Sequence, residues 1–375
     1  MSSQWMEMLK DIINPDRETH AIPSMDGPMR PNAALDDCPI VLSPPAVTRP
    51  EDICADGVGG FLISDGEKLV RFDPARPGEV TAVEQFDAPI SAIASLPGGG
   101  VAVGLDGDGQ GQSQGLRIVG GPHDGKVLDT ADGKAIGCTT ALLALEDQVY
   151  IAQGSTLHTA ADWVWDLMEK NACGRVLRWD LSSGQTEVIC DGLAYPHGLA
   201  PAGDGNGLVV SESWAHRLLR LPLRGRATPE VLIPNYPGYP SRLIANPDGG
   251  YWLTFFAMRT ELLEFVLKED DFRQEMMETV APAFWIRPTL EPNRHYQEPL
   301  QGGGFRVLGI IKPWAPPRSY GLIVELDNRF RVVRSLHSRA DGGNHGVTAV
   351  AGAGGALYAA AKGSGRVLQI EGDGA

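Results

Sequence analysis

Short apolar stretches separated by tight polar turns recur along most of this chain. The pattern is clearest between residues 191 and 221, where the apolar segments Gly198 to Ala200 and Leu208 to Val210 flank the turn Gly203 to Asn206. A third segment, Arg217 to Leu221, follows a second polar turn. Three strands joined by two tight turns form an antiparallel meander. A meander this small cannot bury its own faces, so the pattern predicts a protein built from several such units.

Six units of this kind fit the sequence. Their first strands are predicted at Glu51 to Ala55, Ser91 to Ser95, Thr140 to Leu145, Gly198 to Ala200, Ser241 to Ala245 and His345 to Val350. The sixth unit has only three strands of its own, the last ending at Ile370, and the lone strand Ile40 to Leu42 is available as its fourth. The regular spacing argues against a sandwich or barrel. We therefore expect an all-β, six-bladed β-propeller whose N-terminal strand closes the last blade.

The repeat has an N-terminal extension and two interruptions. We expect residues 1–36 to form an arm and residues 37–375 to form the propeller. The interruptions are residues 154–174 in blade three and residues 256–312 in blade five. Long structured insertions on a rigid scaffold commonly cover a site or mediate contacts, so both are predicted to cap a pocket. Packed surface decoration is the alternative.

The insertions carry helical and aromatic patterns. The first contains a predicted helix from Ala161 to Glu169, and the second contains one from Glu261 to Met277. An aromatic, proline-rich loop with Trp285 and Trp314 follows the second helix. Trp285 is therefore a candidate substrate-binding residue of the cap.

Composition narrows the class of protein. The formal charge of −15 over 375 residues would repel nucleic acid. The sequence contains no run of 18 apolar residues, so we expect no membrane-spanning helix. The N-terminus lacks the basic start and apolar core of a signal peptide. Five cysteines without CxxC spacing indicate reduced thiols. We expect a cytoplasmic protein with a small-molecule substrate; its oligomeric state is left open.

The first residues of the innermost strands should converge on the propeller axis. In this chain they are Glu51, Ser91, Thr140, His197, Ser241 and His345. A lone histidine is more often a hydrogen-bonded structural residue, but Glu51, His197 and His345 at equivalent positions favour a catalytic or metal site. Thr140, Ser241 and the adjacent Arg242 are candidate substrate-binding residues.

Several motifs resemble one family. The segments Gly174-Arg-Val-Leu-Arg-Trp-Asp180, Gly192-Leu-Ala-Tyr-Pro-His-Gly-Leu-Ala200 and Pro237-Gly-Tyr-Pro240 are similar, in order and spacing, to the strictosidine synthase-like family. The resemblance implies a six-bladed propeller related to gluconolactonases, paraoxonases and bacterial lactone hydrolases. In that wider group the active site lies at one end of the central tunnel, usually around a calcium ion.

The residues at the corresponding positions depart from that pattern. Glu51 matches the glutamate that binds calcium in the lactonases, but His197 and Ser241-Arg242 stand where asparagine and an Asp-Asn pair are usual. Two oxygen ligands are therefore missing, and two imidazoles with one carboxylate suit Zn²⁺, Fe²⁺ or Mn²⁺ better than Ca²⁺. Val347 occupies the position of the catalytic glutamate of strictosidine synthases, so that condensation is not expected.

Three functions remain open. The first is a hydrolase of a lactone or related small ester, in which a metal or a His-Glu pair activates water. The second is a lyase or isomerase acting on a small oxygenated or aromatic compound with the same residues. The third is a propeller that binds a ligand without catalysis.

Overall fold

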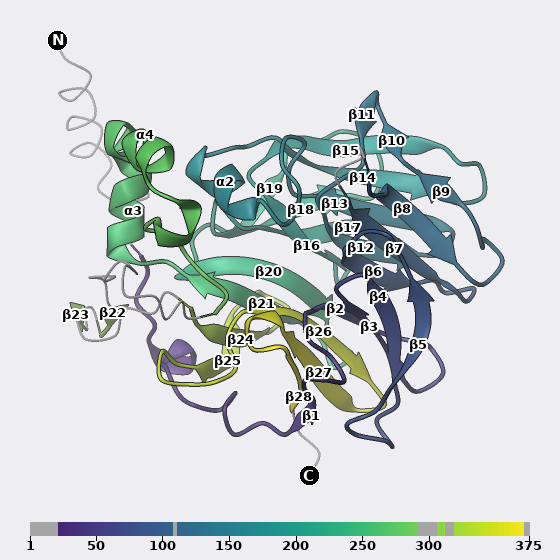
Figure 1. The fold of residues 1–375 in the computed structure, drawn as a ribbon, viewed down its shortest axis with the longest axis horizontal. Helices are drawn as coiled ribbons and strands as arrows, with labels where there is room; N and C mark the ends of the chain where they lie inside the picture. The colour runs from purple at the N-terminus through teal and green to yellow at the C-terminus, as the bar shows by residue number, and fades with distance from the viewer. Residues whose placement is uncertain (1–21, 108–110, 292–305, 309, 312–318, 371–375) are drawn as a thin grey trace.

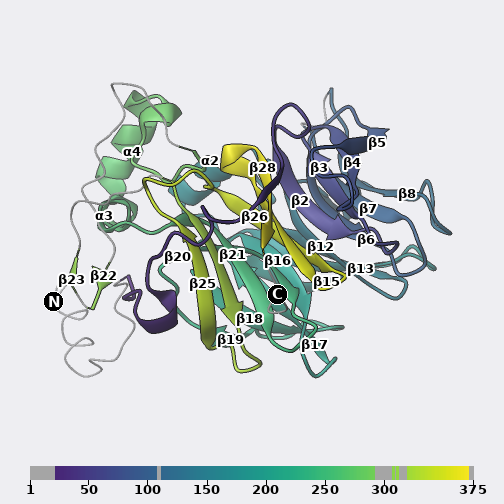
Figure 2. The same ribbon diagram turned by 90° about the horizontal axis from the view of Figure 1, so that it is seen from below.

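A computed structural model describes residues 22–107, 111–291, 306–308, 310–311 and 319–370 of the chain. Within these residues, six four-stranded antiparallel sheets radiate from a common axis (Figures 1 and 2). The predicted all-β, six-bladed propeller is confirmed.

Each blade runs outward from the axis in chain order. Blades one to three contain β2 (Pro50–Ala55), β3 (Phe61–Asp65), β4 (Lys68–Phe72) and β5 (Val80–Gln85); β6 (Ile90–Ser95), β7 (Val101–Asp106), β8 (Gln114–Val119) and β9 (Val127–Leu128); β12 (Thr139–Leu145), β13 (Gln148–Gln153), β14 (Gly174–Asp180) and β15 (Thr186–Leu193). Blades four to six contain β16 (Pro196–Pro201), β17 (Gly207–Glu212), β18 (Arg217–Pro222) and β19 (Glu230–Ile233); β20 (Gly238–Ala245), β21 (Tyr251–Met258), β24 (Gly321–Leu326) and β25 (Val332–Ser338); β26 (Val347–Ala353), β27 (Ala356–Ala361) and β28 (Arg366–Ile370).

The N-terminal strand completes the last blade. β1 (Ile40–Leu42) pairs antiparallel with β28, with Ile40 opposite Leu368. The innermost strands contact one another in the order β2, β6, β12, β16, β20, β26, and β26 returns to β2. Two short hairpins lie outside the blades, β10 (Thr130–Ala131) with β11 (Lys134–Ala135) and β22 (Arg306–Val307) with β23 (Ile310–Ile311).

Apolar side chains fill the space between neighbouring blades. Between blades six and one, Phe61 and Phe72 pack edge-on against Tyr358, with ring centroids 4.7 and 5.6 Å apart. Comparable buried clusters separate the other five pairs of adjacent blades. Because these layers hold the blades rigidly, the loops and strand ends at the axis keep fixed positions.

The insertions form helices that lie together beside one end of the ring (Figures 1 and 2). The first contains α2 (Trp163–Met168), which is shorter than predicted. The second contains α3 (Glu261–Lys268) and α4 (Asp270–Thr279) instead of one continuous helix. The interruption is at Glu269, whose ψ of 82° leaves the helical region. The side chain of Thr260 caps α3 by accepting a hydrogen bond from the backbone of Leu263 at 3.2 Å.

The described part of the N-terminal arm packs along blade five. Met25 and Leu35 are fully buried, and the Asn32 side chain bonds the backbone of β25, donating to Ser335 O at 2.9 Å and accepting from His337 N at 3.0 Å. The arm also contains η1 (Gly27–Met29), and two further single turns are η2 (Pro282–Phe284) and η3 (Lys362–Ser364).

Some of the sequence predictions concern residues that the structure does not describe. The first part of the predicted arm, residues 1–21, and Trp314 lie outside the described residues. Among the helices that the structure describes, none has the length and apolar character needed to cross a membrane.

Candidate functional site

Every innermost strand has a β-bulge at the same place, close to its start. The register of each inner pair skips residues between Pro50 and Asp52, Ile90 and Ala92, Thr139 and Ala141, Pro196 and Gly198, Pro240 and Leu243, and Val347 and Ala349. A bulge redirects the side chain of the extra residue and is common beside active sites. The six bulges bring polar residues from all six blades to one end of the axis.

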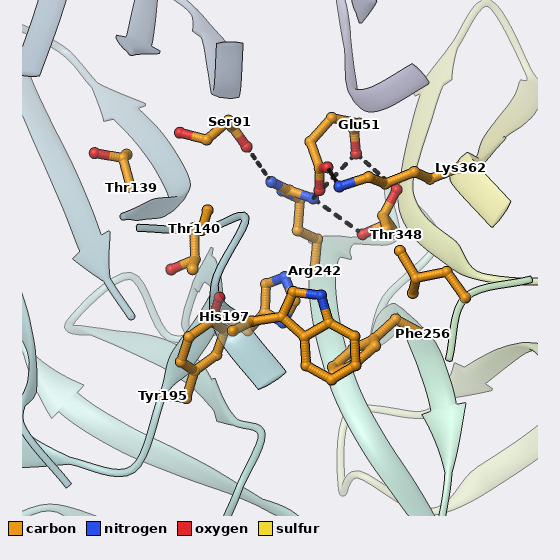
Figure 3. Close-up of a pocket in the computed structure, with 13 residues that line it drawn as sticks. Glu51, Ser91, Thr139, Thr140, Tyr195, His197, Arg242, Phe256, Thr348 and Lys362 are labelled. Carbon is orange, nitrogen blue, oxygen red and sulfur yellow. Dashed lines mark hydrogen bonds and ion pairs between the residues drawn. The ribbon is translucent and has the colours of Figure 1, made fainter. Parts of the chain in front are cut away.

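These bulge residues line a single pocket (Figure 3). Its polar part consists of Glu51, Ser91, Thr140, His197, Arg242 and Thr348, joined by Lys362 and Thr139. The cavity has a volume of about 30 Å³, with room for roughly two water molecules, and it opens to solvent. Of the residues predicted at the axis, Glu51, Ser91, Thr140 and His197 are therefore brought together.

Glu51 is held between two cations. Lys362 Nζ donates to Glu51 Oε2, and Arg242 NH1 lies 3.3 Å from Glu51 Oε1 (Figure 3). Burial opposes ionisation of Glu51, but the charges of Lys362 and Arg242 outweigh it and hold its pKa at about 2. Glu51 is therefore a permanent carboxylate that fixes the ammonium of Lys362 at the pocket wall.

His197 presents one unprotonated nitrogen to the pocket. The Ser213 hydroxyl donates to Pro240 O at 2.6 Å, so Ser213 Oγ accepts from His197 Nδ1 at 3.2 Å. Nδ1 consequently carries the proton, and Nε2 has no hydrogen-bond partner among the described residues. Burial, together with the charge of Arg242, lowers the pKa of His197 to about 3. The imidazole is neutral at physiological pH.

Aromatic side chains form the opposite wall. Trp163 from the first insertion, Phe256 from the end of β21, and Tyr195 line the pocket with Ala160 and with Leu290 from the second insertion. The His197 ring lies against Phe256 and Tyr195, with centroids 5.2 and 5.5 Å away. Both insertions thus contribute residues to the pocket, and the site combines a charged side with an apolar side (Figure 3).

The first insertion is tied to blade two through a buried carboxyl group. Asp106 accepts hydrogen bonds from Ala160 N at 2.7 Å and Cys138 N at 2.9 Å. Burial raises the pKa of Asp106 to about 6, although both N–H donors oppose the rise. This link holds Ala160, and the helix that follows it, over the pocket.

His345 was predicted to converge with Glu51 and His197, and this prediction is wrong. Its Nε2 donates to Arg339 O at 2.7 Å and its Nδ1 bonds Ser319 Oγ at 2.9 Å, outside the pocket. Both nitrogens are hydrogen-bonded away from the pocket, so His345 does not join Glu51 and His197. The strand of blade six begins two residues later than predicted, at Val347, and its bulge selects Thr348.

Two predicted substrate-binding residues also lie away from the pocket. Ser241 is fully buried and its hydroxyl bonds Thr254 Oγ1 at 2.6 Å. In β20 the bulge places both Ser241 and Arg242 opposite Thr254, and Arg242 is the one that reaches the pocket. Trp285 is fully buried in the core of the insertions, where Nε1 donates to Val280 O at 2.7 Å. Trp163 and Phe256 take the place predicted for it.

The predicted metal site does not form. No group of three or more His, Cys, Asp or Glu side chains in the described parts of the chain is arranged to hold a metal ion. Glu51 is already paired with Lys362 and Arg242, and His345 is engaged elsewhere. A divalent cation would meet two positive charges where it needs oxygen ligands, so these residues fit neither Ca²⁺ nor Zn²⁺, Fe²⁺ or Mn²⁺.

Lys362 and Thr348 were not among the residues predicted from the sequence. Strand pairing explains where Lys362 comes from, because the start of an inner strand pairs with the end of the second strand of its blade. Val347 pairs with Ala361, and Lys362 follows directly. Phe256 in β21 and the insertion after β13 reach the pocket by the same geometry. Residues at the end of the second strand of each blade could therefore have been predicted from the sequence as further candidates for the pocket.

Comparison with known proteins agrees with the motifs. Residues 142–225 match the model of the strictosidine synthase family. Strictosidine synthase-like protein 13 of Arabidopsis thaliana is 28% identical over 155 residues, which are 40% of this chain and 38% of that protein. The resemblance to the strictosidine synthase-like family is thus confirmed. Adipocyte plasma membrane-associated protein of Danio rerio is 28% identical over 131 residues, which are 34% of this chain and 32% of the relative. The matches therefore cover only 32% and 38% of the length of these two relatives.

Solved structures share the fold. A gluconolactonase from Xanthomonas campestris superposes with a TM-score of 0.53 at 13% identity, covering 87% of this chain and 86% of its own. A streptogramin B lyase superposes with a TM-score of 0.51 at 11% identity, covering 88% and 96%. At such low identity these similarities establish the architecture alone.

Proposed function

We propose that this protein hydrolyses a lactone or a related small ester in the pocket at the end of the axis. The observation that carries the proposal is the pairing of a neutral His197 with a fixed ammonium, Lys362, on the walls of one small pocket. A general base and an electrostatic stabiliser of negative charge are what ester hydrolysis requires. The gluconolactonase with the same architecture supports the choice of reaction.

The residues have distinct roles in this reaction. His197 Nε2 accepts a proton from water as the water oxygen attacks the carbonyl carbon. The negative charge that develops on the carbonyl oxygen is stabilised by Lys362 Nζ, which Glu51 orients. When the intermediate collapses, the bond to the leaving alkoxide breaks, and the proton on His197 passes to that oxygen. The products are a carboxylic acid and an alcohol, joined in one molecule if the substrate is a lactone.

His197 and Lys362 together suit hydrolysis of an activated carbonyl. Burial lowers the pKa of His197, so its imidazole is neutral and can accept a proton from water, while Lys362 can stabilise the negative charge on the carbonyl oxygen. Strained or activated carbonyls, such as lactones and aryl esters, are the substrates that we expect. A lyase or isomerase reaction with the same residues is the alternative.

The aromatic wall indicates the rest of the substrate. Trp163, Tyr195 and Phe256 form an apolar surface opposite Lys362. Such a surface excludes water and binds an apolar or aromatic group. We therefore expect a small ester or lactone with an apolar body.

Variants of His197 test the proposal. Purified wild-type protein is assayed against a panel of γ- and δ-lactones and aryl esters, next to His197→Gln and the control His123→Gln. His123 lies between β8 and β9 of blade two and is not one of the pocket residues; it pairs with Asp147 at 3.3 Å. The proposal predicts that His197→Gln loses at least 100-fold in kcat/KM and that His123→Gln keeps wild-type rates. Equal rates for all three proteins, or activity with none of the panel, would exclude this function.

A further inference from the structure

Arg242 occupies an unusual position for an arginine. Its side chain is 7% exposed and lies at the axis, surrounded by oxygen atoms from three other blades. The oxygens around the guanidinium are Glu51 O at 3.1 Å and Oε1 at 3.3 Å, Thr348 O at 3.4 Å, Ser91 O at 2.5 Å and Asp52 Oδ2 at 3.3 Å. Arg242 therefore connects blade five with blades one, two and six.

The oxygens around Arg242 would otherwise suit a metal ion. Two carboxylates and three backbone carbonyls form the kind of oxygen set that a hard divalent cation prefers. A guanidinium offers five N–H donors in a fixed plane and remains charged at any physiological pH. It can therefore satisfy several carbonyls and carboxylates at once without an ion from solution.

Asp52 shows that the positive charge is needed here. Asp52 is 4% exposed, and its carboxylate accepts hydrogen bonds from Ile53 N and Ile93 N, both at 2.9 Å. Burial raises the pKa of Asp52, and the charge of Arg242 opposes that rise. Without Arg242, two buried carboxyl groups, Glu51 and Asp52, would face each other at the axis with Lys362 as their remaining cation.

We propose that Arg242 is the resident cation of this propeller, held by the oxygens at the axis in place of a divalent metal ion. The protein then needs no metal either to close its ring or to keep Glu51 ionised. The proposal goes beyond the hydrolase assignment and is independent of it, because it concerns what occupies the axis whatever reaction the pocket performs.

Melting temperatures and metal content test the proposal. The wild-type protein is melted in EDTA and in millimolar CaCl₂, MgCl₂ and MnCl₂, and its metal content is measured by inductively coupled plasma mass spectrometry. We expect the same Tm within 1 °C in all four solutions and no stoichiometric metal. One equivalent of tightly bound metal, or a Tm that falls by several degrees in EDTA, would overturn the proposal.

A double variant shows whether the axis is a cation site. Arg242→Ser with Lys362→Met removes both cations and leaves the oxygens in place. We expect its Tm to fall by roughly 10 °C in EDTA and to recover in part with Ca²⁺. Arg226→Ser, at an exposed arginine that pairs with Asp191, is the control and should show neither effect. A folded double variant whose Tm does not rise with any of the three ions would contradict the proposal. If the double variant does not fold, the measurements on the wild-type protein decide.

Discussion

Acidification should destabilise this protein partly through His197, and replacing that residue should remove part of the effect. Burial and the charge of Arg242 lower the pKa of His197 to about 3 in the folded protein, compared with 6.5 in an unfolded chain. A histidine with a lowered pKa binds its proton more weakly when folded. Its contribution to stability is therefore complete above pH 6.5 and is lost as the pH falls towards 3.

The size of the effect follows from the two pKa values. Between pH 6.5 and pH 5 only the unfolded chain protonates at this residue, and each pH unit changes the free energy of unfolding by about 1.4 kcal/mol. His197 should therefore account for roughly 2 kcal/mol of lost stability at pH 5 relative to pH 7.5. His337, whose pKa burial lowers to about 4, adds a similar slope that is common to wild type and variant.

The assay is urea denaturation of wild-type and His197→Gln protein at pH 7.5 and pH 5.0. Because glutamine does not titrate, the difference in unfolding free energy between the two proteins should shrink by roughly 2 kcal/mol at the lower pH. His337 cancels in this comparison. Parallel losses in both proteins would refute the reasoning, since they would mean that His197 takes up its proton equally in both states.

Three further predictions concern the pocket, the cap and the closure of the ring. Lys362→Met should lower kcat/KM for the best lactone or ester by about 10²- to 10³-fold, with Lys362→Arg in between; a rate equal to wild type would remove Lys362 from the mechanism. Trp163→Ala should raise KM by about 10-fold with kcat nearly unchanged, as steady-state kinetics would show. Trp285→Ala should instead lower the free energy of unfolding, measured by urea denaturation, by roughly 3–5 kcal/mol. A raised KM for Trp285→Ala together with a destabilised Trp163→Ala would contradict the structure. Leu42→Ala in β1 should lower the same free energy by roughly 2–5 kcal/mol, but Ile40→Ala, at a position 48% exposed, should change it by less than about 1 kcal/mol. Equal effects of these two substitutions would mean that β1 does not close the last blade.

The fold was readable from the sequence because it depends on a repeated local pattern. Each blade is a meander whose apolar strands and polar turns follow one another, and six copies specify a ring. The orphan strand Ile40 to Leu42 could be assigned to the last blade because that blade lacked one strand. The break at Glu269 was missed because the apolar positions of α3 and α4 continue in helical spacing across it.

The site was only partly readable because it depends on single-residue register. A bulge in each inner strand decides which side chain meets the axis, and hydrophobic periodicity does not reveal it. In blades one to four the first polar residue was the correct one, as for Glu51 and His197. In blade five the bulge selects Arg242 over Ser241, and in blade six it selects Thr348, which lies three residues beyond His345.

The charge balance of the site was equally hidden. Lys362 and Glu51 are 311 positions apart, and their ion pair depends on closure of the ring between blades six and one. This pair, together with Arg242, changes Glu51 from an expected metal ligand into the counter-ion of two side chains. Long-range pairing of this kind has no signature in the local sequence.

A crystal structure with a small aryl or alkyl phosphonate, a mimic of the tetrahedral intermediate, tests the proposed site most directly. We expect one phosphonate oxygen within hydrogen-bond distance of Lys362 Nζ, a second near His197 Nε2, and the apolar group against Trp163. A phosphonate found instead on the other side of Arg242, in the cavity lined by Asp52 and Cys54, would contradict it.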